Sequence, residues 1–310
     1  MACGNISTFC SHFFNRHPTD LFASAKSMTV MPNSPPATKI TAPLGGSVVV
    51  RTVDPGRPLQ WLGQAWRDMT RCGWISVLHG LAMALAGALM LWLAHDRFWF
   101  MAGAFSGFLL VGPVLATSLY ALSRGLERGE KARFSVVLKT WLNWQDGRIQ
   151  AWGDAQWRLV RFGVLLALAG TAWVLISAGL ITWLAPAPIT SPAAFIAHVV
   201  LAKEGLLFEV WLALGGALVA PIFASTVITI PLLLDRQISV GQAIAASWQV
   251  IFVNPVPMAL WGALIMVLTF VGFATALIGL VLLVPLLGHA SWHAYRDLLD
   301  VTGLPEREQN

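Results

Sequence analysis

The sequence predicts an all-α integral membrane protein with six transmembrane helices. The 310-residue chain is 56% hydrophobic and only 11% charged, whereas a soluble globular chain carries roughly 25% charged residues. Its mean hydropathy is +0.68, and its 15 tryptophans suit a chain that places indole rings at the level of the lipid headgroups. A soluble protein of this composition would have too little polar surface to face water, so a polytopic membrane protein is expected.

Residues 1–48 differ in composition from the rest of the chain. They are rich in Ser, Thr, Pro and Asn and contain no apolar run of the roughly 7–15 residues that a signal peptide needs. We therefore expect a disordered cytoplasmic arm over 1–48, with Met28 or Met31 as alternative start sites. The six-helix membrane domain is expected over 49–300, followed by a cytoplasmic tail over 301–310.

Five apolar stretches almost free of charge locate the membrane helices. They cover about 73–94, 98–123, 162–184, 206–234 and 255–294. As a single helix the last stretch would be roughly 60 Å long, twice the hydrocarbon thickness of a bilayer. It is therefore predicted to be two helices joined by a tight turn near Gly272, which makes six.

The positions of lysine and arginine predict the orientation, because cytoplasmic loops carry an excess of positive charge. With both termini inside, the outer loops hold only Arg97 and Lys203. The inner segments then hold fifteen basic residues: Arg51, Arg57, Arg67, Arg71, Arg124, Arg128, Lys131, Arg133, Lys139, Arg148, Arg158, Arg161, Arg236, Arg296 and Arg307. Both termini are therefore predicted to be cytoplasmic.

An internal repeat relates the even-numbered helices. "VGPVLATSLYALSRGLER", residues 111–128, aligns with "VAPIFASTVITIPLLLDR", residues 219–236, so that Pro113 meets Pro221. Pro285 precedes Arg296 by the same eleven residues that separate Pro113 from Arg124. Because proline removes a helical hydrogen bond, kinks are predicted at Pro113, Pro221, Pro231 and Pro285. The charges that follow should lie at the membrane interface, at Arg128, Arg236 and Arg296.

A tryptophan-bearing amphipathic segment precedes each odd-numbered helix. In the first segment, Leu59, Leu62, Trp66 and Met69 share one face at helical spacing. The same spacing recurs in two further segments, at Phe134, Val137, Leu138 and Trp141, and at Ile244, Trp248 and Ile251. We expect three interfacial helices on the cytoplasmic surface, with Trp66, Trp141 and Trp248 as interfacial anchors, each followed by a hairpin of two membrane helices.

Several of these segments also carry a family resemblance. "HGLAMALAGALMLWLA", "SGFLLVGPVLATSLYALSRGLERGE" and "NPVPMALWGALI" with "PLLGHASWHAYRDL" resemble a bacterial family of predicted integral membrane proteins known only as a domain of unknown function (the 2189-type family). The resemblance covers roughly residues 50–300 and implies a bacterial inner-membrane protein. It implies no activity, substrate or catalytic residue.

Three histidines are the candidate site residues. His79 lies about seven residues into the first helix, and His289 and His293 lie near the cytoplasmic end of the sixth, one turn apart. Ionisable residues inside a membrane are costly and are therefore candidates for function. If the first and sixth helices are neighbours, the three imidazoles could bind haem or a metal or relay protons. The alternative is that each histidine bonds a backbone carbonyl or reaches the interface.

The remaining ionisable and nucleophilic residues indicate no catalytic site. Cys3, Cys10 and Cys72 form no CxxC pair and no disulfide framework, so free thiols on a reducing side are expected. The sequence contains no HExxH or GxSxG motif. The net charge of +5 comes with no compact basic patch, so membrane lipid, a second copy or another membrane protein is expected as partner rather than nucleic acid.

Three functions are compatible with these features. The first is a non-enzymatic scaffold, assembly factor or lipid-handling module, favoured by the amphipathic segments. The second is a transporter or channel built on proline-kinked repeats. The third is a haem- or metal-binding protein using His79, His289 and His293.

Overall fold

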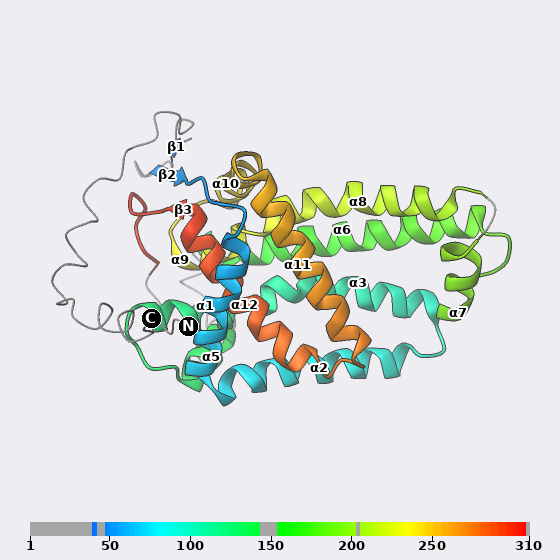
Figure 1. Cartoon of the computed structure of the whole chain (residues 1–310), viewed down its shortest axis with the longest axis horizontal. Coiled ribbons are helices and arrows are strands. Elements are labelled where there is room, and N and C mark those ends of the chain that lie inside the picture. Colours follow the sequence, from blue (N-terminus) through cyan, green and yellow to red (C-terminus); the bar gives the residue numbers. More distant parts are fainter. Residues whose placement is uncertain (1–38, 42–46, 143–153, 203–204, 308–310) are drawn as a thin grey trace, which may run out of the picture. The chain divides into compact units, whose positions relative to one another are not determined.

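The computed structural model describes residues 39–41, 47–142, 154–202 and 205–307 (Figure 1). The chain divides into two units, Met1–Pro36 and Ala37–Asn310. The first unit and most of the predicted arm over 1–48 lie outside the described residues. The second unit is built of helices, as the composition predicted, with one small antiparallel sheet in addition.

Helices α1 and α2 are separated by a glycine hinge. α1 spans Arg57–Cys72 and α2 spans Trp74–Ala94. Between them Gly73 has φ of +58°, a left-handed conformation that glycine adopts without the penalty of a Cβ. Its N–H closes the end of α1 on the carbonyl of Met69 at 2.9 Å. The chain therefore leaves α1 at a sharp turn and enters the first apolar helix.

The two aligned proline segments both contain a broken helix. α3 (Phe98–Leu115) is interrupted at Ala116 before α4 (Thr117–Glu127). α8 (Leu207–Thr226) is interrupted before α9 (Thr229–Asp235). Pro113 lies in the last turn of α3, and Pro221 lies inside α8. Each break follows its proline by a few residues, so both segments consist of a long helix and a short one.

The other two predicted kink prolines are accommodated without a break. Pro231 lies in the first turn of α9, where backbone N–H groups have no partner within the helix in any case. Pro285 lies inside α12 (Leu280–Leu298), which continues past it. The interrupted-helix pattern therefore occurs twice in the described chain and does not extend to the third proline segment.

The long stretch 255–294 forms two helices, as predicted. α11 (Pro255–Ala274) ends at a turn over residues 275–279, and α12 follows. Ala276 and Leu277 both have positive φ, 52° and 70°, which marks a tight reversal. The remaining elements are α5 (Phe134–Leu142), α6 (Asp154–Leu184), α7 (Pro192–Phe195), a π-helix (Ile196–Val200) and α10 (Val240–Val253).

Four helical segments among the described residues are long and apolar enough to cross a membrane. They are Trp74–Ala94, Gly163–Leu184, Leu207–Asp235 and Pro255–Ala274. Only 22% of the apolar segment of α11 is buried inside the protein, so most of its apolar surface is free to face lipid. These features fit an integral membrane protein. α12 and the α3–α4 segment are not among the four.

α12 is the centre of the packed core. It lies beside α1 and crosses α2, and its C-terminal half contacts α4 and α9 (Figure 1). A Cβ on Gly80 of α2 would lie 2.1 Å from the carbonyl oxygen of Val281, so the two helix backbones approach closely because residue 80 has no side chain. Trp61 of α1 is fully buried in this core, and so are Trp292 and Tyr295 of α12.

Strands extend the core at both ends of the described unit. β1 (Lys39–Thr41), β2 (Ser47–Val50) and β3 (Leu299–Asp300) pair antiparallel in the order β1-β2-β3. Val48 and Val50 of β2 are buried, and so are Val301 and Leu304 in the segment predicted as a tail. The packed unit therefore uses residues on both sides of the expected domain over 49–300.

Candidate functional site

The structure brings the three predicted histidines to one region of the core. His79 is on α2, and His289 and His293 are on α12, the helix packed against it. His289 is fully buried and His79 is 9% exposed, whereas the His293 side chain is 20% exposed. The first and last long helices are therefore neighbours, which the histidine prediction required.

Two of the histidines belong to a continuous chain of hydrogen bonds, which we call the histidine chain (His293, Asp68, Ser123, His289 and Ser76). Nε2 of His293 lies 2.8 Å from Oδ2 of Asp68. The Ser123 hydroxyl donates to the same oxygen at 2.7 Å and lies 2.7 Å from Nδ1 of His289. Nε2 of His289 lies 3.0 Å from the Ser76 hydroxyl. Four helices, α1, α2, α4 and α12, supply these five side chains.

The hydrogen bonds determine the direction of donation along the chain. A hydroxyl has one proton, and Ser123 gives its proton to Asp68. Nδ1 of His289 must therefore donate to Ser123, and both ring nitrogens of this buried imidazole are occupied. The donors point toward the carboxylate of Asp68.

Asp68 and Cys72 show opposite effects of the same environment on α1. Burial alone would raise the pKa of the Asp68 carboxyl, but hydrogen bonds from His293 and Ser123, with electrostatic interactions with the two α12 histidines, bring it below its ordinary value. Burial raises the pKa of the Cys72 thiol to about 11. Asp68 is therefore held as a carboxylate and Cys72 as a thiol.

His79 stands apart from the histidine chain. Its Nδ1 lies 3.2 Å from the Ser118 hydroxyl of α4, and its Nε2 is buried without a hydrogen-bond partner in the part of the chain that the structure describes. Across the described ranges, no three His, Cys, Asp or Glu side chains are grouped so as to hold a metal ion. A haem or metal role for His79, His289 and His293 stays a prediction.

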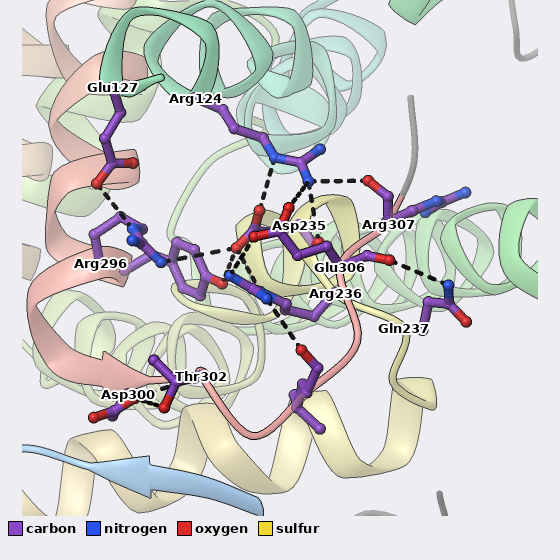
Figure 2. Close-up of polar contacts among 12 residues, drawn as sticks. Arg124, Glu127, Asp235, Arg236, Gln237, Arg296, Asp300, Thr302, Glu306 and Arg307 are labelled. Atoms are coloured by element: carbon purple, nitrogen blue, oxygen red, sulfur yellow. Dashed lines mark hydrogen bonds and ion pairs between the residues drawn. The ribbon is translucent and has the colours of Figure 1, made fainter. Parts of the chain in front are cut away.

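A second polar cluster lies at the ends of α4, α9 and α12, and we call it the charge seam (Arg124, Glu127, Asp235, Arg236, Arg296 and Glu306; Figure 2). Its centre is an ion pair between Nε of Arg124 and Oδ1 of Asp235, 2.8 Å apart, with side chains only 4% and 3% exposed. The Tyr295 hydroxyl donates to the other oxygen of Asp235 at 2.7 Å. Arg236 approaches that oxygen at 3.1 Å.

The outer part of the charge seam is more exposed. Nε of Arg296 lies 3.1 Å from Glu127, whose other oxygen accepts from Trp292 Nε1 at 3.2 Å. Arg128 and Arg236 both pair with Glu306. The arginines predicted at the interface thus lie at helix ends, and each pairs with an acidic residue.

The segment after α12 returns into the charge seam (Figure 2). The backbone N–H of Arg307 donates to the Asp235 carbonyl at 2.9 Å, and Nη2 of Arg124 donates to the Arg307 carbonyl at 2.9 Å. Gln237 donates through its side chain to the Glu306 carbonyl at 3.2 Å. Arg307 thus binds Asp235 of α9 and Arg124 of α4 through its backbone.

The tryptophans predicted as anchors have different surroundings. Trp66 is 49% exposed. Trp248 is partly buried and donates through Nε1 to Ser225 of α8 at 2.9 Å. The side chain of Trp141 lies outside the described residues.

Sequence reasoning missed Asp68, Ser76 and Ser123. A signal for Asp68 was present, because it continues the spacing of Trp61, Ala65 and Cys72, which form the buried face of α1. No comparable signal marked the two serines, which resemble the many small residues of membrane helices.

Residues 99–235 match the model of a family described as "Predicted integral membrane protein (DUF2189)". The match confirms the resemblance carried by the motifs, over a shorter range than residues 50–300. It runs from α3 to α9 and includes Ser123, Arg124 and Asp235, whereas Asp68 and His289 lie outside it. No curated protein and no solved structure matches the chain.

Proposed function

We propose that this integral membrane protein crosses the bacterial inner membrane six times and serves as a non-enzymatic scaffold that binds anionic lipid at the cytoplasmic surface. The α3–α4 segment and α12 would add two spans to the four candidates. The excess of arginine and lysine in the inner segments supports cytoplasmic termini.

The observation that carries the lipid-binding proposal is the division of α1 into two faces. Trp61, Ala65 and Cys72 are buried, and Trp61 Nε1 donates to Asp297 of α12 at 2.9 Å. Leu59 and Trp66 on the other side are 64% and 49% exposed. α1 is thus fixed to the protein by one face and presents a second apolar face outward.

Basic side chains border the exposed apolar face of α1. Arg67 and Arg71 are one turn apart and both exposed. An apolar strip beside basic residues suits a helix lying in the headgroup region of an anionic leaflet. Trp74, 64% exposed, continues the strip and stacks on Phe134 of α5 with ring centroids 5.8 Å apart.

The test is the retention of phosphatidylglycerol and phosphatidylcholine by the purified full-length protein, measured by native mass spectrometry. The double variant R67Q/R71Q should lose the preference for the anionic lipid by several-fold. Arg97→Gln is the matched control, because Arg97 is also exposed but lies at the opposite end of α2. If R67Q/R71Q and wild type retain the two lipids equally, the lipid-binding role is wrong.

A transporter is the second candidate, favoured by the breaks in α3–α4 and α8–α9. Interrupted helices line substrate sites in many transporters. Flux of ions and small solutes into liposomes containing the protein would separate the two functions. Solute-specific flux would favour transport, and leakage equal to that of empty liposomes would favour the scaffold.

A Soret band in membranes containing the protein would instead support haem binding.

A further inference from the structure

We propose that three arginines at the ends of α4 and α9 form a phosphate-binding site, which the carboxylate of Glu306 fills in this conformation. The three are Arg124, Arg128 and Arg236, and each forms an ion pair with Glu306. Arg124 and Arg236 approach the glutamate from two different helices (Figure 2). The site uses no residue of the exposed α1 face and does not depend on lipid binding by that face.

Glu306 satisfies the three arginines unequally. Nη2 of Arg236 lies 3.3 Å from Oε1 of Glu306, and Arg128 pairs with Oε2. Nη2 of Arg124 lies 4.0 Å from Oε2, which is too far for a hydrogen bond. Two carboxylate oxygens therefore face three guanidinium groups, and one of the three groups is left with a distant contact.

Arg124 is the buried member of the site. Its side chain is only 4% exposed, with Nε beside Asp235, and its Nη2 donates to the Arg307 carbonyl at 2.9 Å. Its Nη1 is buried without a hydrogen-bond partner in the described part of the chain. Buried polar groups are normally hydrogen-bonded, so Arg124 keeps donor capacity that the two nearby carboxylates do not use.

A phosphate group suits this arrangement better than a carboxylate does. A phosphate monoester has three strong acceptor oxygens and a charge of about −1.5 to −2 near pH 7, and arginine binds it through paired N–H···O bonds. The three arginines face only two carboxylates, those of Asp235 and Glu306. One positive charge is therefore in excess and is available to balance the second charge of a phosphate.

The Glu306 side chain can leave the arginines without unfolding its segment. The side chain is 54% exposed, and Arg128 beside it is 44% exposed. The backbone is held separately, because Gln237 N–H donates to the Pro305 carbonyl at 3.1 Å and Arg307 N–H donates to the Asp235 carbonyl at 2.9 Å. Rotation of one side chain is therefore enough to admit a ligand from the Arg128 side.

The position of the site along the chain suits a ligand at the membrane surface. Arg236 directly follows the candidate span Leu207–Asp235, and the end of a span lies near the level of the lipid headgroups. A lipid phosphate and a soluble phosphate share the chemistry that the arginines recognise. The experiment therefore uses one probe of each kind.

Glu306→Gln is the variant to make, because it removes the resident charge and keeps the size of the side chain. Inorganic phosphate is titrated into full-length protein in phosphatidylcholine nanodiscs and followed by phosphorus NMR. Retention of phosphatidic acid relative to phosphatidylcholine is measured by native mass spectrometry. Glu306→Gln should bind the probe about fivefold more tightly than wild type, the equilibrium equivalent of one surface ion pair.

Three further variants show whether the gain belongs to this site. E306Q/R128Q removes an exposed arginine of the site and should lose the gain. Asp300→Asn releases Arg51 from another exposed pair, at 3.0 Å, but frees a single arginine and should give no gain. R67Q/R71Q changes the α1 face, and adding Glu306→Gln to it should still give the gain, so the two lipid-binding roles fail independently.

Each outcome decides the proposal. A gain with both probes supports a site for the phosphate group itself, a gain with phosphatidic acid alone supports a lipid site, and a gain with inorganic phosphate alone supports a site for soluble phosphates. The site is overturned if Glu306→Gln binds neither probe more tightly than wild type. It is also overturned if Asp300→Asn gives the same gain, or if E306Q/R128Q keeps it.

Discussion

Arg124 and Asp235 form a buried ion pair between two short helices, α4 and α9, each of which follows a helix break in an aligned proline segment. Nε of Arg124 lies 2.8 Å from Oδ1 of Asp235, and both side chains are at most 4% exposed. The pair therefore joins the two copies of the internal pattern near the C-terminal end of each short helix.

Removal of one partner of this pair should strongly destabilise the protein. Arg124→Met leaves the Asp235 carboxylate buried without its main counter-ion, and breaking a buried pair in this way costs about 3–5 kcal/mol. We expect a large fall in the thermal unfolding temperature in detergent. The double variant R124M/D235L removes both charges and should recover part of the loss.

The control for the ion pair is Arg128→Gln. Arg128 pairs with Glu306 at the surface, where the side chains are 44% and 54% exposed, and such pairs contribute about 0–1 kcal/mol. If Arg124→Met were as mild as Arg128→Gln, the central role of the buried pair would be wrong.

Gly80→Ala should separate α2 from α12. The added Cβ would lie 2.1 Å from the carbonyl oxygen of Val281, and overpacking a tight contact costs about 1–3 kcal/mol. Gly63→Ala on α1 is matched to it, because a Cβ there meets nothing within 4 Å and alanine favours a helix by about 0.5–1 kcal/mol. Thermal unfolding should therefore shift in opposite directions in the two variants.

The turn between α11 and α12 should face the outside of the cell. Ile278 in this turn is 75% exposed. In a chain whose three native cysteines are replaced by serine, Ile278→Cys should react with a membrane-impermeant maleimide added to intact cells. Lys131→Cys, in the exposed loop between α4 and α5, should react only after lysis. Labelling of position 278 only after lysis would contradict the six-span topology.

Asp300 should give the protein a pH-dependent stability at acid pH. The Thr302 hydroxyl and N–H donate to its carboxylate at 2.8 and 3.1 Å, and Arg51 pairs with it at 3.0 Å, which lowers its pKa to about 2. A carboxyl group whose pKa is lower in the folded state than in the unfolded state, where it is about 3.9, stabilises the folded protein at pH values above about 3.9. This stabilisation is lost as the pH falls toward about 2.

Comparison of wild type with Asp300→Asn isolates this effect. The difference in unfolding temperature should be constant above about pH 5 and should shrink as the pH falls toward 2. Thr302→Val removes one donor and should weaken the same pH dependence. If the difference in unfolding temperature stays constant down to pH 2.5, the ionised carboxylate of Asp300 does not stabilise the folded protein.

Helical spacing predicted the existence of α1 but did not distinguish its buried face. Of Leu59, Leu62, Trp66 and Met69, only Met69 is buried. In a membrane protein both the core and the lipid-facing surface are apolar, so periodicity cannot separate them. The residue that reveals the core side of α1 is Asp68, whose carboxylate is bound by Ser123 and His293 of other helices.

Charge and apolar length predicted the integral membrane class and the division of residues 255–294 into two helices. They could not predict the three-stranded sheet, since β2 and β3 join Val49 to Asp300 across the length of the chain. They also could not predict that Asp235 is buried, because its partner Arg124 is 111 residues away in sequence.

The return of residues 304–307 into the charge seam has a consequence for biosynthesis. Glu306 and Arg307 contact α4 and α9, yet a ribosome adds them only after α12 has been made. α4 and α9 are therefore synthesised long before these two partners. The contacts of Glu306 and Arg307 with the two short helices can form only once α12 is complete.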